Sequence, residues 1–414
     1  MKMNSSKRVY LDYASATPLD PRVGEVMESC WTNCFANPSA IHADGLEARR
    51  LVDEAREGVA TLVGARIQEV VFTGGGTESD NLAILGVVSA YRERNPGCIP
   101  HVVTSAFEHE AVLAPLGCLE KRGWAKVTRV LPGTGGVMRV EDIITAITGD
   151  TVLVSIMAVQ NEIGTIQPIR EIAKALRKWK IDHGGPTREV SEGATAQYPY
   201  FHTDACQLPG VGDVFVPRLG VDLLTLNASK ISGPKGVGLL VVRAGVVIDP
   251  ILFGGGHEGG MRPGTENAPG IVGFAKALAL TLEDQPSEIA RLSVLRNRLL
   301  CGLQDLLPDV IVNGDLNMRS ANNINVTYPG ADHEFIALGL DAHGISVATK
   351  SACSELGDAE TSHVLSALRE GDGRLDLPAS GIRMTLGRET TEEDIDRTRD
   401  AWKSMKESGN YFRT

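Results

Sequence analysis

Short apolar runs recur through the first part of the chain, each bounded by glycine or polar residues. They comprise residues 70–73, 101–104, 126–130, 152–157, 200–203, 221–226 and 237–242. Runs of this length, rich in branched and aromatic side chains, are typical of strands buried on both faces. Because helical patterns separate the runs, the sequence predicts an α/β fold with a mostly parallel central sheet flanked by helices.

Apolar residues spaced three and four apart predict the flanking helices. The clearest apolar face follows Gly45 and consists of Ala48, Leu51, Val52, Ala55, Val59 and Leu62. Gly64 is expected to end this helix. Between the second and third strands we expect a helix to begin near Pro115, since proline is tolerated in a first turn and not deeper.

After residue 268 the pattern changes to long helices and short strands. One helix is expected to begin at about Ser287, with an apolar stripe of Ile289, Leu292, Leu299 and Leu303. Strand-like segments follow at 323–328, 345–348 and 382–386. Thr390 and Glu393 are spaced as a capping box that would open the final helix.

These patterns divide the chain into two domains. Residues 15–267 are expected to form a large domain that contains the sheet, and residues 1–14 with 268–414 a smaller α+β domain. Residues 182–199, which include Gly184-Gly185-Pro186, lack the pattern of a helix or strand. Since loops of this length are uncommon inside compact domains, we expect a structureless surface insertion that leaves the sheet intact.

Composition narrows the class of protein. The 414 residues are 43% hydrophobic, and the formal charge of −11 argues against nucleic acid or an anionic membrane as the main partner. No apolar run reaches the length of a membrane span and the N-terminal residues lack a secretion signal, so a cytoplasmic protein is expected. The seven cysteines are odd in number and lack paired spacing, which fits reduced thiols. Cys30 and Cys34 lack a second ligand pair, so we expect core packing and no metal.

Polar side chains follow two of the apolar runs. The run 200–203 leads to Asp204, and the run 221–226 leads to Lys230. Ligands of α/β sheets bind at the carboxyl ends of the strands. A desolvated lysine there can form a Schiff base, and an aspartate can hold a pyridinium proton, which together suit pyridoxal phosphate (PLP). Taken singly, Lys230 also fits a surface lysine and Asp204 a turn residue.

A glycine-rich loop follows the run 70–73. Gly74, Gly75 and Gly76 precede Thr77 at the start of a predicted helix that extends to about Arg92. Glycines let the backbone approach an anion, and a helix N-terminus offers unpaired N–H groups, so the loop is a candidate phosphate site. It lacks the Gly-Lys-Ser ending of a nucleotide-triphosphate loop. A plain strand-to-helix turn would also use glycine.

Five segments in order resemble the cysteine desulfurases, PLP enzymes of fold type I that are related to class V aminotransferases. The segments are Thr77-Glu78-Ser79-Asp80-Asn81-Leu82, Asn161-Glu162-Ile163-Gly164, Lys230 with Gly233-Pro234-Lys235-Gly236, Arg262-Pro263-Gly264-Thr265-Glu266-Asn267 and Ser351-Ala352-Cys353. The resemblance covers nearly the whole chain. It implies conversion of L-cysteine to L-alanine, with the sulfur carried as a persulfide for iron-sulfur cluster assembly or tRNA thiolation.

The resemblance also implies roles for individual residues. Lys230 would bind PLP as a Schiff base, with Asp204 at the pyridine nitrogen, Gln207 at the ring hydroxyl and His109 stacked on the ring as a proton shuttle. Residues implied at the phosphate are Gly76, Thr77, Asn227, Ser229 and, from a second subunit of a homodimer, Thr265. Asn161 and Arg383 would bind the substrate's α-carboxylate, although a buried arginine paired with a structural acid is the alternative for Arg383.

Cys353 would be the nucleophile that accepts sulfur and hands it to a protein acceptor. Asn227 and Ser229 stand where the family usually has Ser and His, which removes a positive charge beside the phosphate. Lys350 stands where glycine is common, and Cys206 is expected to be a packing residue. Three alternatives remain open from the sequence: a selenocysteine lyase, a class V aminotransferase without sulfur transfer, and a degenerate scaffold that has lost catalysis.

Overall fold

The computed structural model describes residues 8–183, 187–191, 194–349 and 361–412. Cys353 and Lys350 therefore lie outside the described residues. A seven-stranded sheet organises the large part of the molecule in the order β2-β10-β9-β8-β5-β3-β4. Its strands are β2 (Val70–Thr73), β3 (His101–Ser105), β4 (Lys126–Val130), β5 (Thr151–Ser155), β8 (Tyr200–Asp204), β9 (Leu223–Asn227) and β10 (Gly238–Val242).

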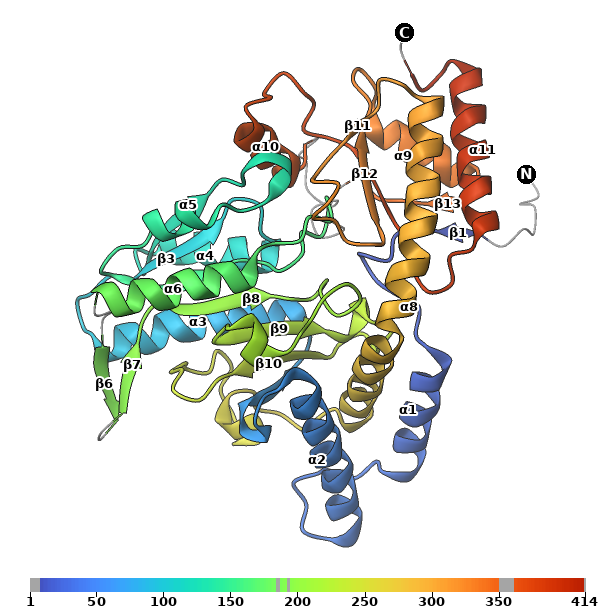
Figure 1. Ribbon diagram of the computed structural model, residues 1–414. Coiled ribbons are helices and arrows are strands. Elements are labelled where there is room, and N and C mark those ends of the chain that lie inside the picture. Colours follow the sequence, from blue (N-terminus) through green and yellow to red (C-terminus); the bar gives the residue numbers. More distant parts are fainter. Residues whose placement is uncertain (1–7, 184–186, 192–193, 350–360, 413–414) are drawn as a thin grey trace.

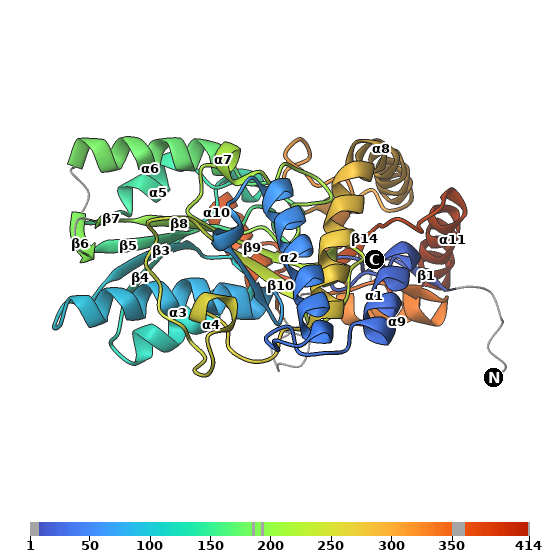
Figure 2. The same cartoon turned by 90° about the horizontal axis from the view of Figure 1, so that it is seen from below.

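The sheet is mostly parallel, as predicted. Only β10 runs antiparallel, and it does so against both β2 and β9. Figure 2 shows the sheet between two layers of helices, with α3 and α4 on one face and α5, α6 and α7 on the other. The bounds of these helices are α3 (Gly76–Arg94), α4 (Glu110–Lys121), α5 (Val140–Thr145), α6 (Ile169–His183) and α7 (Val216–Leu219).

Helix α4 begins earlier than predicted. It starts at Glu110 with His109 as its N-cap, and Pro115 lies inside it. An internal proline leaves the carbonyl four residues before it without its helical N–H donor. That carbonyl belongs to Ala111, and the side chain of Asn81 on α3 donates to it at 3.3 Å. A contact between helices therefore replaces the bond that Pro115 removes, which the local sequence pattern does not reveal.

One long helix, α8 (Ala268–Leu306), replaces the helix predicted to begin at Ser287. Its N-cap is Asn267, and Pro286 lies inside it. The first half of α8 contributes Phe274 to the core of the large sheet, whereas the second half contributes Leu299 to the core of the small sheet. Burial at both ends of the helix offsets the hydrogen bond that Pro286 removes. The proposed domain boundary thus falls at the first residue of a helix that serves both cores (Figure 1).

The C-terminal part contains two small sheets. The strands β11 (Ile311–Val312), β12 (Asn323–Thr327) and β14 (Ile382–Thr385) form an antiparallel sheet, and β1 (Val9–Tyr10) pairs with β13 (Ile345–Ser346). The accompanying helices are α9 (His333–Ala342), α10 (His363–Asp372) and α11 (Glu392–Ser408), while α1 (Pro21–Asn33) and α2 (Ala43–Val63) pack on α8. The capping box of α11 is formed by Thr391 and Asp394, one residue later than predicted. Thr390 is instead buried and accepts from the N–H of Gly387.

The segment predicted to be a structureless insertion contains a hairpin. Strands β6 (Thr187–Ser191) and β7 (Ala194–Gln197) pair antiparallel with each other and lie apart from the main sheet. The prediction of no structure was therefore wrong, because the ladder of backbone hydrogen bonds between two short strands needs no apolar periodicity. The main sheet is uninterrupted, as expected. Within the described ranges, no helix is long and apolar enough to cross a membrane.

The contact between Asn81 and Pro115 generates a stability prediction. Asn81→Ala leaves the buried carbonyl of Ala111 without a donor, which should lower the free energy of unfolding by about 1–3 kcal/mol. In the Pro115→Ala background the restored helical N–H reaches that carbonyl, so the same substitution should cost less. Urea unfolding of the four proteins in this double-mutant cycle measures the difference. Equal costs in both backgrounds would show that Asn81 does not compensate for the proline.

Candidate active site

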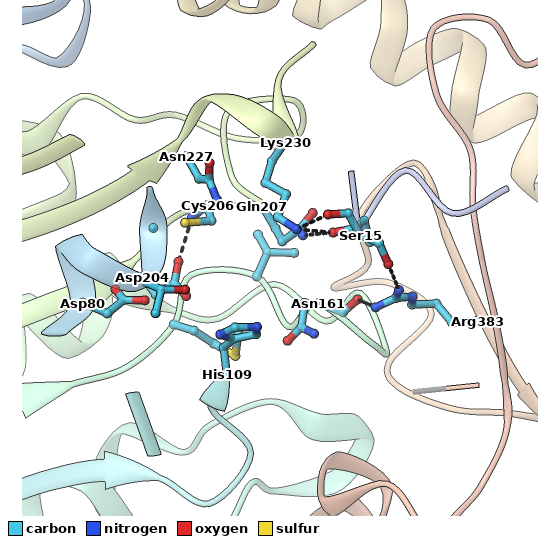
Figure 3. A pocket seen from close by; sticks show the side chains of 15 residues that line it. Ser15, Asp80, His109, Asn161, Asp204, Cys206, Gln207, Asn227, Lys230 and Arg383 are labelled. Atoms are coloured by element: carbon cyan, nitrogen blue, oxygen red, sulfur yellow. Dashed lines mark hydrogen bonds between the residues drawn. The ribbon is translucent and has the colours of Figure 1, made fainter. Parts of the chain in front are cut away.

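One pocket collects most of the residues that the sequence singled out (Figure 3). It opens where β5, β8 and β9 end and α3 begins, and the small sheet closes its other side. Its lining residues are Ala14, Ser15, Gly76, Thr77, Asp80, His109, Met157, Val159, Asn161, Asp204, Cys206, Gln207, Asn227, Lys230 and Arg383. Parallel strands that end at the same edge therefore bring these residues together, as the apolar pattern predicted.

Asp204 lies at the end of β8 and is buried, with 7% of its surface exposed. Its Oδ1 accepts from the N–H of Cys206 at 2.9 Å. Two residues earlier on the same face of the strand, His202 bonds to Ser155 Oγ at 2.8 Å and Thr225 Oγ1 at 3.1 Å. Complete burial lowers the pKa of His202 to about 4, so this ring stays neutral beneath Asp204.

Asp80 is a pocket residue whose role the sequence analysis missed. It lies one turn into α3 and is buried, and its Oδ1 has no hydrogen-bond partner among the described residues. Burial, together with the negative charge of Asp204, raises the pKa of Asp80 well above its usual range, which favours the protonated form. The sequence does contain a signal for the burial of Asp80. Asp80, Ala83 and Val87 are spaced three and four apart, so Asp80 occupies the apolar face of its helix.

Lys230 ends a short turn that follows β9. Its Nζ donates to the carbonyl oxygens of Ala14 at 2.8 Å and Ser15 at 2.5 Å. Gln207 Nε2 donates to the same Ala14 carbonyl at 2.9 Å. Lys230 is therefore a partly buried pocket residue, and the alternative of a surface lysine is wrong. The amine of Lys230 and the carboxylate of Asp204 line the same pocket (Figure 3).

Glycines in and beside the loop that follows β2 allow a strained backbone angle and close approaches. Gly75 has a φ of 149°, and a Cβ added to Gly238 on β10 would lie 2.4 Å from the carbonyl carbon of Gly75. A Cβ on Gly76 would lie 2.8 Å from Cys206 Sγ. These close approaches exclude side chains at Gly76 and Gly238, so no loop side chain at position 76 covers the N-terminus of α3, which suits an anion. Cys206, expected to be a packing residue, contacts this loop and also lines the pocket.

A second, adjoining pocket continues from the loop. It is lined by Gly74, Gly75, Gly76, Thr77, Glu78, Asn81, Asn227, Ser229, Lys235, Gly236, Ile251 and Leu252. Asn227 Oδ1 accepts from both the N–H and the hydroxyl of Ser229, at 3.2 and 3.1 Å. The oxygen of the Asn227 amide is thus engaged, which leaves its nitrogen as the end suited to an anion. Backbone N–H groups, the Asn227 amide nitrogen and the Thr77 hydroxyl form a donor set that fits a phosphate.

His109 caps α4 on the side that faces the pocket. Its Nδ1 accepts from the N–H of Ala111 at 3.1 Å. An acceptor at Nδ1 places the proton of the neutral imidazole on Nε2. The helix cap thereby fixes the tautomer as well as the position of the ring.

Arg383 lies on β14 and is 1% exposed. Its Nη2 donates to Asp12 Oδ1 at 2.8 Å and Ser15 Oγ at 2.7 Å, and its Nη1 donates to the carbonyl of Asn161 at 3.1 Å. The structural acid considered as an alternative therefore exists, and it is Asp12. The pairing leaves Arg383 in the pocket lining, where the Asn161 side chain joins it.

Thr265 is exposed and lies outside both pockets of the described chain. Its implied role depends on a second subunit, so it stays a prediction, as does the role of Cys353. Among the described residues no group of three or more His, Cys, Asp or Glu side chains is arranged to hold a metal ion. Cys30 packs in the core of the large sheet with Cys34 against it, as expected.

Comparison with known proteins places the chain in a class. The family model described as "Aminotransferase class-V" matches residues 9–182 and 185–398. The chain therefore belongs to the class V aminotransferase family.

Within this family the chain is a cysteine desulfurase. It is 42% identical over 394 residues to the cysteine desulfurase IscS of Dictyoglomus turgidum, covering 95% of this chain and 93% of the relative. A solved structure titled "NIFS-LIKE PROTEIN" superposes with a TM-score of 0.84 at 32% identity, covering 97% of this chain and 100% of the other. A structure of SspA in complex with cysteine gives 0.73 at 32% identity, with coverage of 91% and 98%. The resemblance read from the sequence and the predicted fold class are confirmed.

A buried acid beside His109 generates a pH prediction. Glu108 is fully buried, accepts from Ser105 Oγ and from the N–H of Met157, and has no partner for Oε2 among the described residues. Burial raises the pKa of Glu108 to about 8. Because the folded pKa exceeds the unfolded one, the stability that its proton contributes is present at acid pH and is lost as the pH rises towards 8.

Glu108→Gln removes this titration while keeping the shape of the side chain. The variant should gain stability over the native protein between pH 5 and pH 8, at most by about 1.4 kcal/mol per pH unit. Thermal unfolding across this range measures the gain, with the exposed Glu57→Gln as a control that should follow the native curve. Parallel curves for Glu108→Gln and the native protein would exclude a protonated Glu108.

Proposed function

We propose that this cysteine desulfurase binds PLP in the pocket and converts L-cysteine to L-alanine, passing the sulfur to Cys353 as a persulfide. The observation that supports this most directly is that Lys230 and Asp204 line one pocket with Arg383 at its other end. The amine suits the carbonyl group of a cofactor, the carboxylate suits its ring nitrogen, and the guanidinium suits the carboxylate of an amino acid. The pocket therefore has a place for both cofactor and substrate.

The cofactor would be held by residues of the large sheet. Lys230 would bind it covalently, Asp204 would keep the ring nitrogen protonated, and Gln207 would contact the ring hydroxyl. The N–H groups beside Gly76, the Thr77 hydroxyl, Asn227 and Ser229 would hold its phosphate. When bound, PLP supplies a sink for the electrons released at the substrate Cα.

The protein's own groups would move protons and sulfur. The amine of Lys230 would take the Cα proton, and His109 would donate from Nε2, because the helix cap occupies Nδ1. Arg383 and Asn161 hold the α-carboxylate. The thiolate of Cys353 would attack the substrate sulfur, so that a new S–S bond forms as the S–Cβ bond breaks. The electron pair of the broken bond stays with Cβ, which takes up a proton as alanine forms. The persulfide then passes to a protein acceptor, such as an iron-sulfur cluster scaffold or a tRNA-thiolation protein.

Two substitutions test this function. We expect Lys230→Ala to lose the absorbance of the bound cofactor and alanine formation together. Cys353→Ala should keep the absorbance but lose alanine formation from L-cysteine, because only the sulfur acceptor is removed. Spectra, alanine release, and mass spectrometry of Cys353 measure these outcomes, with L-selenocysteine as a second substrate. Full activity of Cys353→Ala on cysteine would contradict the sulfur step, and faster selenocysteine turnover with no persulfide would indicate a lyase.

We also propose a homodimer, in which Thr265 of one subunit completes the phosphate site of the other. Several large apolar side chains are highly exposed, among them Ile41 at 94%, Phe253 at 88% and Phe35 at 82%. A groove along α3 and α4 includes the exposed side chains of Ile99 and Phe253 and reaches Thr77 and His109 at the pocket. Large exposed apolar side chains are typical of an interface, and here they border the site.

Phe253→Glu should yield a monomer by light scattering and lose most of the desulfurase activity, because a charge cannot be buried in such an interface. Leu375→Glu serves as the matched control. Leu375 is a large apolar residue that is 76% exposed, and it lies outside the groove. A fully active monomer would contradict the shared site. A dimer that persists in Phe253→Glu would place the interface elsewhere.

A further inference from the structure

The turn from Asp12 to Ser15 lies between the two ends of the pocket. The carbonyl of Ser15 accepts from Lys230 Nζ, while the hydroxyl of Ser15 accepts from Arg383 Nη2. Lys230 follows strand β9 of the large sheet, whereas Arg383 lies on β14 of the small sheet, 368 positions after Ser15 in the sequence. A short N-terminal segment therefore contacts both the amine and the guanidinium on which the proposed reaction depends (Figure 3).

Asp12, Ser15 and Arg383 form a closed triangle of hydrogen bonds. Arg383 Nη2 donates to Asp12 Oδ1 at 2.8 Å and to Ser15 Oγ at 2.7 Å. The Ser15 hydroxyl in turn donates to Asp12 Oδ1 at 2.9 Å. Every donor in the triangle has an acceptor, so the polarity is consistent. One carboxylate oxygen and one hydroxyl thus occupy both protons of Nη2.

The Nε of the same guanidinium is buried and, unlike Nη2, makes no hydrogen bond within the described residues. Nε and Nη2 form the edge on which a carboxylate binds an arginine with two parallel hydrogen bonds. On Arg383 this edge is half satisfied: Asp12 and Ser15 hold Nη2, and Nε is left over. A buried unpaired donor is costly, which favours any ligand that reaches it.

We propose that Asp12 is an internal competitor for the substrate's α-carboxylate, braced by Ser15, and that it sets how weakly Arg383 holds amino acids. This inference rests on the proposed role of Arg383. An incoming carboxylate takes Nε and displaces Asp12 from Nη2, so binding exchanges one ion pair for another. When the product leaves, Asp12 returns to the guanidinium, and the buried cation is never left without an anion. Asp12 is a positioning and specificity residue in this arrangement and does not touch the reacting atoms.

The backbone around Asp12 is held independently of its side chain. The carbonyl of Asp12 accepts from Tyr10 Oη at 3.0 Å and from the N–H of Ser15 at 3.1 Å. Thr385 on β14 accepts from the N–H of Ala14 and donates its own N–H to Leu11. A substitution that changes only the charge of Asp12 therefore keeps the turn in place. Asp12→Asn separates competition from structure.

The test compares ligands with and without a carboxylate on the PLP-loaded enzyme. Asp12→Asn should lower the KM for L-cysteine and the Kd for L-alanine by about tenfold, the loss of a charged competitor. Binding of cysteamine, which is L-cysteine without its carboxylate, should not change. Ser15→Ala, which removes the brace and an acceptor, should shift both constants in the same direction by about twofold. Asp20→Asn is the control, since it removes the charge of a buried carboxylate that pairs with Arg22 outside the pocket.

The outcomes separate this inference from the proposed function. Unchanged or increased KM and Kd in both Asp12→Asn and Ser15→Ala would overturn competition by Asp12. An equal change for cysteamine would also overturn it, because the effect would not depend on the carboxylate. If the native enzyme neither binds nor desulfurates L-cysteine, the proposed function fails instead. Calorimetry with L-alanine gives a readout that does not require turnover.

Discussion

The parallel pairing of β8 with β9 is the constraint on which the site depends. Asp204 is the last residue of β8 and lies opposite Thr225, so the chain reaches the end of β9 only two residues later. A single turn then delivers Lys230 to the same edge of the sheet. Because neighbouring strands have a fixed spacing, the carboxylate and the amine cannot drift apart without breaking ladder hydrogen bonds. The antiparallel β10 supports the same edge, since Gly238 lets the glycine-rich loop lie directly against it.

Charge balance around this edge follows from burial. Three buried carboxyl groups, those of Asp80, Glu108 and Asp204, lie near one another, and the buried His202 next to Asp204 is neutral. Burial favours protons on Asp80 and Glu108, because several negative charges cannot share a site of low dielectric. In the proposed function, Asp204 is the one of these three acids that would contact the ring nitrogen of the cofactor.

The sequence predicted what depends on local pattern. Strand ends and glycine spacing identified Asp204, Lys230 and the loop at Gly76, because the direction of parallel strands carries that information. It failed where distant contacts decide: the start of α4 depends on Asn81 from another helix, and the continuity of α8 through Pro286 depends on two separate cores. The pairing of Arg383 with Asp12 joins residues 371 positions apart, and no local pattern encodes it. The raised pKa of Asp80 likewise depends on burial and on the nearby charge of Asp204, both of which only the fold supplies.

The two ends of the pocket belong to different sheets, which explains why the N-terminal turn matters. Lys230 follows a strand of the large sheet, whereas Arg383 lies within β14 of the small sheet. If Lys230 holds the cofactor and Arg383 the substrate carboxylate, as proposed, the distance between them must be fixed for one amino acid to reach both. Helix α8 packs in the cores of both sheets, so it fixes the approximate distance between them. Ser15 restrains the two side chains more closely, because its carbonyl accepts from Lys230 and its hydroxyl accepts from Arg383. In the proposed function, the alignment of substrate with cofactor would therefore depend on a turn that lies far in sequence from both Lys230 and Arg383.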